Sequence, residues 1–183
     1  MYNAYFNCRE RKRWKNINFE INYNEEINKL YEQLCNRTYM IGTSQCFIVT
    51  KPKLREIFAA NFRDRIIHHL VINELMPYFE STLIDSCYSS RKGKGTLYGQ
   101  KDLFKKIYQA SEGYTKDVYI AKFDIKSFFP SINKYLLFKV VRKFILEKYK
   151  KSTLDTMLWL CEQIILNSPQ INCKICGKLD LWN

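Results

Sequence analysis

Glycine and proline are scarce in this sequence, with six and four among 183 residues. Flexible linkers are commonly rich in glycine, and no repeat or low-complexity tract is present either. The length suits one domain or slightly more, and a hydrophobic content of 46% excludes a disordered chain. The composition therefore predicts a folded chain with a substantial core.

Long apolar runs are also missing. No stretch approaches the roughly 18 apolar residues that a membrane span needs. Residues 1–14 are polar, aromatic and basic, which does not fit a secretory signal peptide. We therefore expect a cytoplasmic protein with no membrane partner. An anionic membrane surface is a weaker candidate than nucleic acid, because no basic amphipathic anchor stands out.

Cysteines are few for a disulfide scaffold, and the seven present are scattered, which favours a reducing compartment. Only Cys173 and Cys176 have metal-ligand spacing, and Cys161 is the only nearby sulfur in the sequence. Because structural zinc normally takes four ligands, we expect no zinc here. A polar turn carrying two free thiols is the preferred interpretation.

Acidic residues are outnumbered: 18 Asp and Glu face 30 Lys and Arg, for a net charge of +12. Such a surplus makes nucleic acid the leading candidate partner. Aromatic residues make up 15% and could stack on unpaired bases, although we expect most of them in the core. A basic cluster at residues 9–13 is either a solvated face or a contact for template RNA.

The hydrophobic pattern predicts an α+β fold. Apolar spacing indicates helices at residues 25–37, 64–75, 98–110, 134–148 and 152–166, with Pro77 as a stop for the second. β-rich runs indicate a hairpin from residues 46–50 and 55–59, and a further strand at 118–124. Strands and helices do not alternate regularly, so a doubly wound sheet is excluded.

Asp124 is the most informative acidic residue, because it directly follows the apolar strand that ends at Phe123. A carboxylate there loses hydration unless something compensates it. A helix N-cap would do so, and for an isolated Asp this is the favoured role. A divalent cation such as Mg²⁺ is the other compensation.

The run Asp-Ile-Lys-Ser-Phe-Phe that starts at Asp124 resembles the first catalytic motif of reverse transcriptases. The resemblance implies that Asp124 ligates both catalytic Mg²⁺ ions, and that the backbone carbonyl of Ile125 is a further ligand. It also implies that Phe129 packs beneath the incoming sugar and would clash with a 2′-hydroxyl.

Upstream blocks agree with this resemblance in the right order. Lys51-Pro-Lys-Leu-Arg-Glu-Ile resembles the fingers hairpin, which implies that Lys51, Lys53 and Arg55 grip the incoming triphosphate. Arginine suits bidentate phosphate contacts, and lysine acts as a point charge.

Two more blocks follow this hairpin. Phe62-Arg-Asp-Arg-Ile-Ile-His-His resembles a block whose helix lies near template, which implies template contacts for Arg63 and Arg65. Of the adjacent His68 and His69, we expect one packed and one near template. Cys87-Tyr-Ser-Ser-Arg-Lys-Gly-Lys-Gly-Thr resembles the next block, and its basic residues suit phosphates: Arg91, Lys92 and Lys94.

Together the blocks, from residue 47 to residue 132, look most like bacterial reverse transcriptases of diversity-generating retroelements, close to group II intron and retron enzymes. The resemblance implies a basic, helical lead-in at 1–45, fingers at 46–115 and a partial palm at 116–183, with a palm strand bearing Asp124. It further implies an RNA template, a DNA primer, deoxynucleoside triphosphates and an accessory protein as partners.

One departure limits the resemblance. Reverse transcriptases carry an aromatic-X-Asp-Asp motif, and this sequence contains no adjacent pair of aspartates. We therefore expect the N-terminal part of an RNA-directed DNA polymerase, inactive alone, with apolar residues exposed around Phe123 and Ile125. Two alternatives stay open: a non-catalytic nucleic-acid-binding module, and a polymerase-like defence protein that extends DNA without a template.

Overall fold

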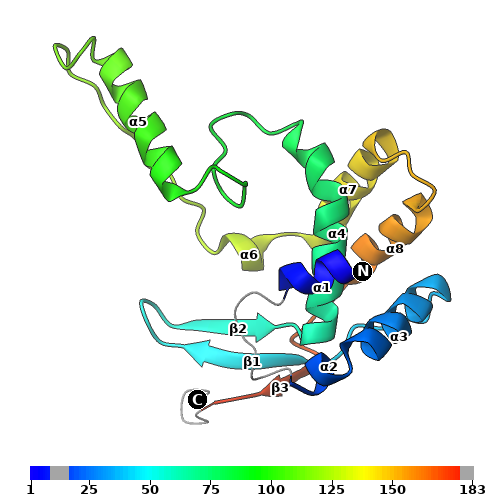
Figure 1. Cartoon of the computed structure of the whole chain (residues 1–183). Helices are drawn as coiled ribbons and strands as arrows, with labels where there is room; N and C mark the ends of the chain where they lie inside the picture. The colour runs from blue at the N-terminus through cyan, green and yellow to red at the C-terminus, as the bar shows by residue number, and fades with distance from the viewer. Residues whose placement is uncertain (9–16, 178–183) are drawn as a thin grey trace. The chain divides into compact units, whose positions relative to one another are not determined.

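The computed structural model describes residues 1–8 and 17–177, which form a mixed α+β fold as the sequence predicts. Figure 1 shows the elements in chain order. The helices are α1 (Tyr2–Cys8), α2 (Ile17–Ile21), α3 (Tyr23–Cys35), α4 (Phe62–Glu80), α5 (Thr96–Ala110), α6 (Phe128–Ser131), α7 (Lys134–Lys148) and α8 (Leu154–Leu166). The strands are β1 (Ser44–Val49), β2 (Arg55–Ala59) and β3 (Cys173–Ile175). Within the described ranges, no helix combines the length and the apolar character that a membrane crossing requires.

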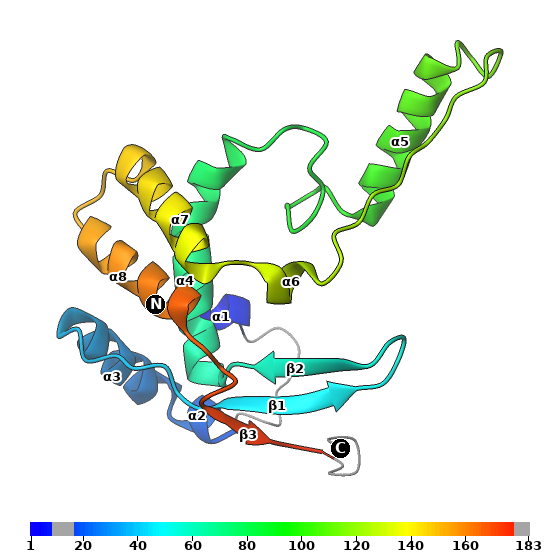
Figure 2. The same ribbon diagram turned by 180° about the vertical axis from the view of Figure 1, so that it is seen from behind.

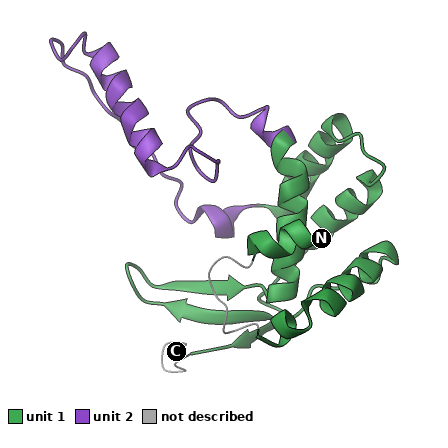
Figure 3. Cartoon of the chain, viewed as in Figure 1, with its two compact units in different colours: residues 1–77, 133–183 green, residues 78–132 purple. Residues whose placement is uncertain are grey.

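The chain divides into two compact units (Figure 3). Unit 1 comprises Met1–Pro77 and Asn133–Asn183, and unit 2 comprises Tyr78–Ile132. The predicted boundaries at residues 45 and 115 describe functional subdomains and do not coincide with these units, so that division stays a prediction.

The sheet of unit 1 has the strand order β2-β1-β3. Strands β1 and β2 form the predicted antiparallel hairpin, with Val49 opposite Arg55 next to the connecting turn. Strand β3 runs parallel to β1, with Cys173 opposite Ser44, and both views show β1 in the middle (Figures 1 and 2). The prediction of a turn at Cys173 was wrong, because pairing with a strand some 130 residues upstream leaves no local signal.

Helices α3 and α4 supply much of the core of unit 1. Helical spacing places Ile27, Leu30 and Leu34 of α3 inside, as predicted, whereas Tyr31 is 58% exposed. On α4 the apolar spacing offers Ile66, Leu70, Ile72 and Leu75 for the core: Ile66 and Leu75 are buried and Leu70 is half-buried, but Ile72 is 49% exposed. The predicted helix stop at Pro77 was wrong: α4 continues to Glu80, since a proline removes one backbone hydrogen bond without ending every helix.

Helices α7 and α8 form a second layer of unit 1 and lie side by side in both views (Figures 1 and 2). Their bounds match the predicted helices closely. The Asn133 side chain caps α7 by accepting from the backbone N–H groups of Tyr135 and Leu136 at 3.0 and 3.1 Å. The facing helices bury Ile145, Met157 and Leu160.

Unit 2 contains α5, its flanking loops and α6, and buries few side chains. Residues 118–125 are not a strand, which corrects the prediction for 118–124. A strand needs a neighbour to pair its backbone groups, and among the described residues no strand pairs with this segment. Its apolar side chains are consequently exposed, with Tyr119 at 97% and Phe123 at 91%.

Candidate functional site

The turn end of the β1–β2 hairpin brings the three predicted triphosphate contacts together. Lys51 and Lys53 lie in the connection between the strands, and Arg55 begins β2. All three side chains are exposed, and none forms an ion pair with another described residue. Unpaired, exposed cations on a short hairpin can approach an anion without first breaking an internal contact.

The start of α4 is organised by Asp64, a residue that sequence reasoning did not single out. Its carboxylate has no exposed surface, and accepts hydrogen bonds from the Tyr39 hydroxyl at 2.8 Å and the Gly42 backbone N–H at 2.9 Å. The backbone N–H of Asp64 donates to the Asn61 side chain at 3.0 Å. Burial, followed by the neighbouring carboxylate, raises the pKa of Tyr39 far above its ordinary value, so this hydroxyl remains a donor.

Arg63 and Arg65, the predicted template contacts, flank Asp64 and are partly engaged within unit 1. Arg63 donates to the Met40 carbonyl at 3.3 Å and to the Gln33 side chain, and its guanidinium lies over the Tyr39 ring. Arg65 lies over the Phe62 ring, and its buried Nε has no hydrogen-bond partner in the described structure. Their contact with template stays a prediction.

His68 and His69 follow on the same helix, and both are half-buried. Burial lowers the pKa of His68, with the Asp64 charge acting in the opposite direction and His69 adding a smaller lowering effect. His68 therefore behaves as a packed, neutral histidine near neutral pH. The template role predicted for one histidine of the pair is untested.

The loop between α4 and α5 is held by two of the three cations predicted to bind phosphate. Arg91 donates through Nε to Glu80 at 2.8 Å, and through Nη1 to the carbonyls of Ile84 and Cys87 at 3.0 and 2.9 Å. Lys94 pairs with Asp85 and donates to its backbone carbonyl at 2.8 Å.

These contacts distinguish the structural roles of Arg91 and Lys94 from that of Lys92. The Arg91 side chain is 10% exposed and that of Lys94 17%, so both organise the loop. Hydrogen bonding to Lys94 lowers the pKa of Asp85 below its ordinary value. Lys92, between them, is exposed and has no ion pair among the described residues, which leaves it as the loop cation best placed for phosphate.

The predicted catalytic stretch lies in unit 2. It begins inside the unpaired segment 118–125, which contains Asp124 and Ile125. Asp124 and Ile125 are exposed, and Phe129 on the short helix α6 is 83% exposed. Ser127 has a φ of 53°, in the left-handed region, where the extended chain turns into α6. Phe129 contacts Phe128 edge-on, with ring centroids 5.3 Å apart. The turn therefore presents a carboxylate and an aromatic ring five residues apart.

A pair of catalytic Mg²⁺ ions does not fit the donor set of the described residues. No group of three or more metal-ligating side chains occurs in the described ranges, and Asp124 provides a single carboxylate. Two ions about 3.5–4 Å apart require several anionic ligands. The described residues therefore supply at most part of such a site.

Where β1 pairs with β3, the Cys46 thiol lies near Cys173 and Cys176, which follow it by some 130 residues in the sequence. Cys46 is 1% exposed, and the backbone N–H of Cys176 donates to its carbonyl at 2.8 Å. Burial raises the pKa of Cys46, and the neighbouring thiol of Cys173 adds to this. Sequence reasoning missed Cys46 because the strand register that brings it there is not visible locally. The absence of zinc stays a prediction.

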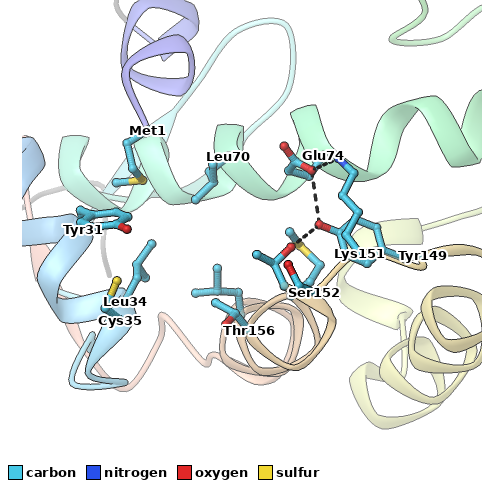
Figure 4. A pocket seen from close by; sticks show the side chains of 13 residues that line it. Met1, Tyr31, Leu34, Cys35, Leu70, Glu74, Tyr149, Lys151, Ser152 and Thr156 are labelled. Atoms are coloured by element: carbon cyan, nitrogen blue, oxygen red, sulfur yellow. Dashed lines mark hydrogen bonds and ion pairs between the residues drawn. The ribbon is translucent and has the colours of Figure 1, made fainter.

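A pocket of about 470 Å³ lies within unit 1, between α3, α4 and the start of α8 (Figure 4). At one end Glu74 accepts from Lys151 at 2.6 Å and from the Tyr149 hydroxyl at 3.3 Å. Figure 4 shows Tyr31 and Leu34 at the other end. The charge of Glu74 is already shared internally, so the pocket offers an apolar wall and a neutral polar end.

No protein-family model matches this chain, and no curated protein matches it either. The predicted basic cluster at residues 9–13 lies outside the described residues.

Proposed function

We propose that this chain supplies the triphosphate grip and the first catalytic carboxylate of an RNA-directed DNA polymerase of the reverse-transcriptase type. The observation that carries the proposal is the turn end of the β1–β2 hairpin, where Lys51, Lys53 and Arg55 are exposed and form no ion pair in the described structure. It supports the sequence resemblance, because a triphosphate needs mobile cations that no internal carboxylate has neutralised.

The reaction assigned to the complete polymerase joins a primer 3′-hydroxyl to the α-phosphate of a nucleotide and releases pyrophosphate. Negative charge accumulates on the leaving group, and cations beside the β- and γ-phosphates stabilise it. We assign this task to Lys51, Lys53 and Arg55. We assign to Phe129 the steric selection of deoxyribose. Its ring is exposed and therefore free to contact the sugar.

Template binding is assigned chiefly to Lys92, with Arg63 and Arg65 as the other candidates. Phosphate contacts by such residues are independent of sequence and sensitive to salt. Arg91 and Lys94 are assigned a different role, because their donors already hold the loop. This assignment refines the sequence prediction that all three loop cations contact phosphate.

A second candidate function is a nucleic-acid-binding module without catalysis. The carboxylate of Asp124 favours it, since the described residues form no group of three or more metal-ligating side chains. The two candidates differ in one respect: a polymerase part binds nucleoside triphosphates through the hairpin, and a simple binding module has no need to.

The test is equilibrium binding of thymidine triphosphate to the 183-residue chain. The triple variant Lys51→Ala, Lys53→Ala, Arg55→Ala should bind at least about tenfold more weakly, which corresponds to about 1.4 kcal/mol. The matched control is Lys139→Ala, Lys143→Ala, Lys148→Ala, which removes the same charge from exposed positions of α7. Equal weakening in both variants, or equal affinity for thymidine and its triphosphate, would contradict the proposal.

A further inference from the structure

A second hollow lies in unit 1 where α7, α8 and the end of α3 meet. Its volume is about 370 Å³, within the range of small-molecule sites. Helix α8 contributes Asp155, Leu158, Trp159 and Glu162, which helical spacing places on one face. Helix α7 adds Phe138 and Arg142, one turn apart, and Arg37 enters from the residue that follows the α3 C-cap.

The charged side chains around this hollow do not neutralise one another. Arg37, Arg142, Asp155 and Glu162 are all exposed. Within the described ranges none of them forms an ion pair, although two cations and two anions share one small hollow. Each therefore keeps its hydrogen-bonding capacity for a ligand or for solvent.

Arg37 has a left-handed backbone conformation, which glycine adopts more readily than other residues. Its φ is 55°, and the N–H groups of Arg37 and Thr38 donate to the carbonyls of Leu34 and Gln33 at 3.2 and 2.9 Å, as in a left-handed helix ending. A non-glycine residue is disfavoured there. Arginine at this position therefore has a strained backbone conformation. Its guanidinium lies over the Trp159 ring, 5.9 Å from the centroid.

Trp159 provides the aromatic surface of the hollow. It is half-buried, and Tyr39 contacts its ring edge-on at 6.4 Å between centroids. Tyr39 is in turn held by Asp64 at 2.8 Å, so the indole is supported by a fixed network. A supported indole with an exposed arginine above it is a suitable platform for a nucleic-acid base.

We propose that this hollow binds a guanine nucleotide, with the base stacked on the Arg37 guanidinium that lies over Trp159 and the phosphate held by Arg142. The carboxylate of Glu162 offers acceptors only. The Watson–Crick edge of guanine presents two adjacent donors, N1–H and N2–H, which one carboxylate accepts together. Adenine and cytosine each present an acceptor beside a donor, and uracil flanks its single donor with two acceptors, so neither pattern matches Glu162. Asp155, one turn earlier, remains for the ribose hydroxyls.

This inference uses none of the residues assigned to triphosphate or template binding, and it does not depend on the proposed function. The ligand chemistry has two sources: a free guanine nucleotide, and an unpaired guanosine in RNA. Thymidine triphosphate, the probe for the hairpin, does not match the hollow, so failure of one proposal leaves the other standing.

The test measures equilibrium binding of guanosine 5′-monophosphate, adenosine 5′-monophosphate and guanosine to the 183-residue chain. We expect guanosine 5′-monophosphate to bind at least tenfold more tightly than either of the others. The pentanucleotides UUGUU and UUAUU distinguish the sources: tighter binding of UUGUU than of the mononucleotide indicates RNA, and equal binding indicates the free nucleotide.

Arg37→Gly is the decisive variant, because glycine fits the backbone at this position better than arginine does. We expect an unchanged or higher melting temperature together with at least tenfold weaker binding of guanosine 5′-monophosphate. Glu162→Gln replaces two acceptors by an acceptor and a donor, which matches adenine, so the base preference should move from guanine toward adenine. Unchanged binding in Arg37→Gly, or an unchanged base preference in Glu162→Gln, would overturn the proposal.

Discussion

Asp64 shows that a single residue can connect three parts of unit 1. Its carboxylate joins the first turn of α4 to Tyr39 and to the backbone of Gly42, ahead of β1. The Tyr39 ring then contacts Trp159 of α8. A charged group with no exposed surface stabilises a protein only when donors surround it, and its loss leaves those donors without partners.

We predict that Asp64→Ala lowers the free energy of unfolding by about 3 kcal/mol, because the Tyr39 hydroxyl and the Gly42 N–H lose a charged acceptor. Tyr39→Phe should cost less, since it removes one donor and leaves the carboxylate bonded to Gly42. Urea denaturation measures both, with Glu32→Ala as the control for an exposed carboxylate. Equal losses for Asp64→Ala and Glu32→Ala would show that the network contributes little.

His68 should make the stability of the fold depend on pH. Burial lowers its pKa in the folded chain, so the unfolded chain takes up a proton first as the pH falls. Stability is therefore full above the unfolded value of about 6.5 and declines below it, by at most about 1.4 kcal/mol per pH unit. Denaturation at pH 7.5 and 5.5 should show a smaller decline for His68→Gln than for His69→Gln. The same decline in both variants would contradict this role.

At the scale of elements, the loop between α4 and α5 contains two cations with internal partners, Arg91 and Lys94, and one exposed cation, Lys92, to which we assign phosphate binding. We predict that Lys92→Ala lowers the slope of RNA affinity against salt by about one, the loss expected for one phosphate contact. Arg91→Ala should instead open the loop and speed its cleavage by chymotrypsin near Tyr88, because four donor contacts are lost. A reduced salt slope in Arg91→Ala without faster cleavage would reverse the assignment.

Elements with strong local patterns were predictable, and elements that depend on distant partners were not. The periodicity of α3, α7 and α8 and the β1–β2 hairpin are confirmed. Residues 118–124 have the composition of a strand but no neighbour among the described residues, so composition alone misled the prediction. Strand β3 is the reverse case: its local sequence pattern is weak, but it forms a strand because it pairs with β1.

The candidate site was predictable to a similar extent. The resemblance to reverse transcriptases implied that Lys51, Lys53 and Arg55 contact phosphate; their exposure is compatible with that role, which stays a prediction. Sequence alone did not distinguish Lys92 from Arg91 and Lys94, because their internal partners Glu80 and Asp85 are set by the folded loop. Asp64 was hidden for the same reason, since its donors lie 22 and 25 residues upstream.

The whole molecule combines a net charge of +12 with binding groups in both units and a single carboxylate at the predicted catalytic position. Binding needs only correctly presented cations, whereas two-metal phosphoryl transfer needs several carboxylates together. We therefore propose that this chain binds nucleotide and template, and we predict that polymerisation requires acidic groups beyond those the described residues bring to Asp124.

Primer extension on an RNA template tests this most directly, with the 183-residue chain, Mg²⁺ or Mn²⁺, and a labelled primer whose binding is followed in the same reaction. We predict that the primer–template binds and that the primer is not extended with either ion. Extension that disappears in Asp124→Ala would contradict it, because another acidic group of this chain would then complete the site.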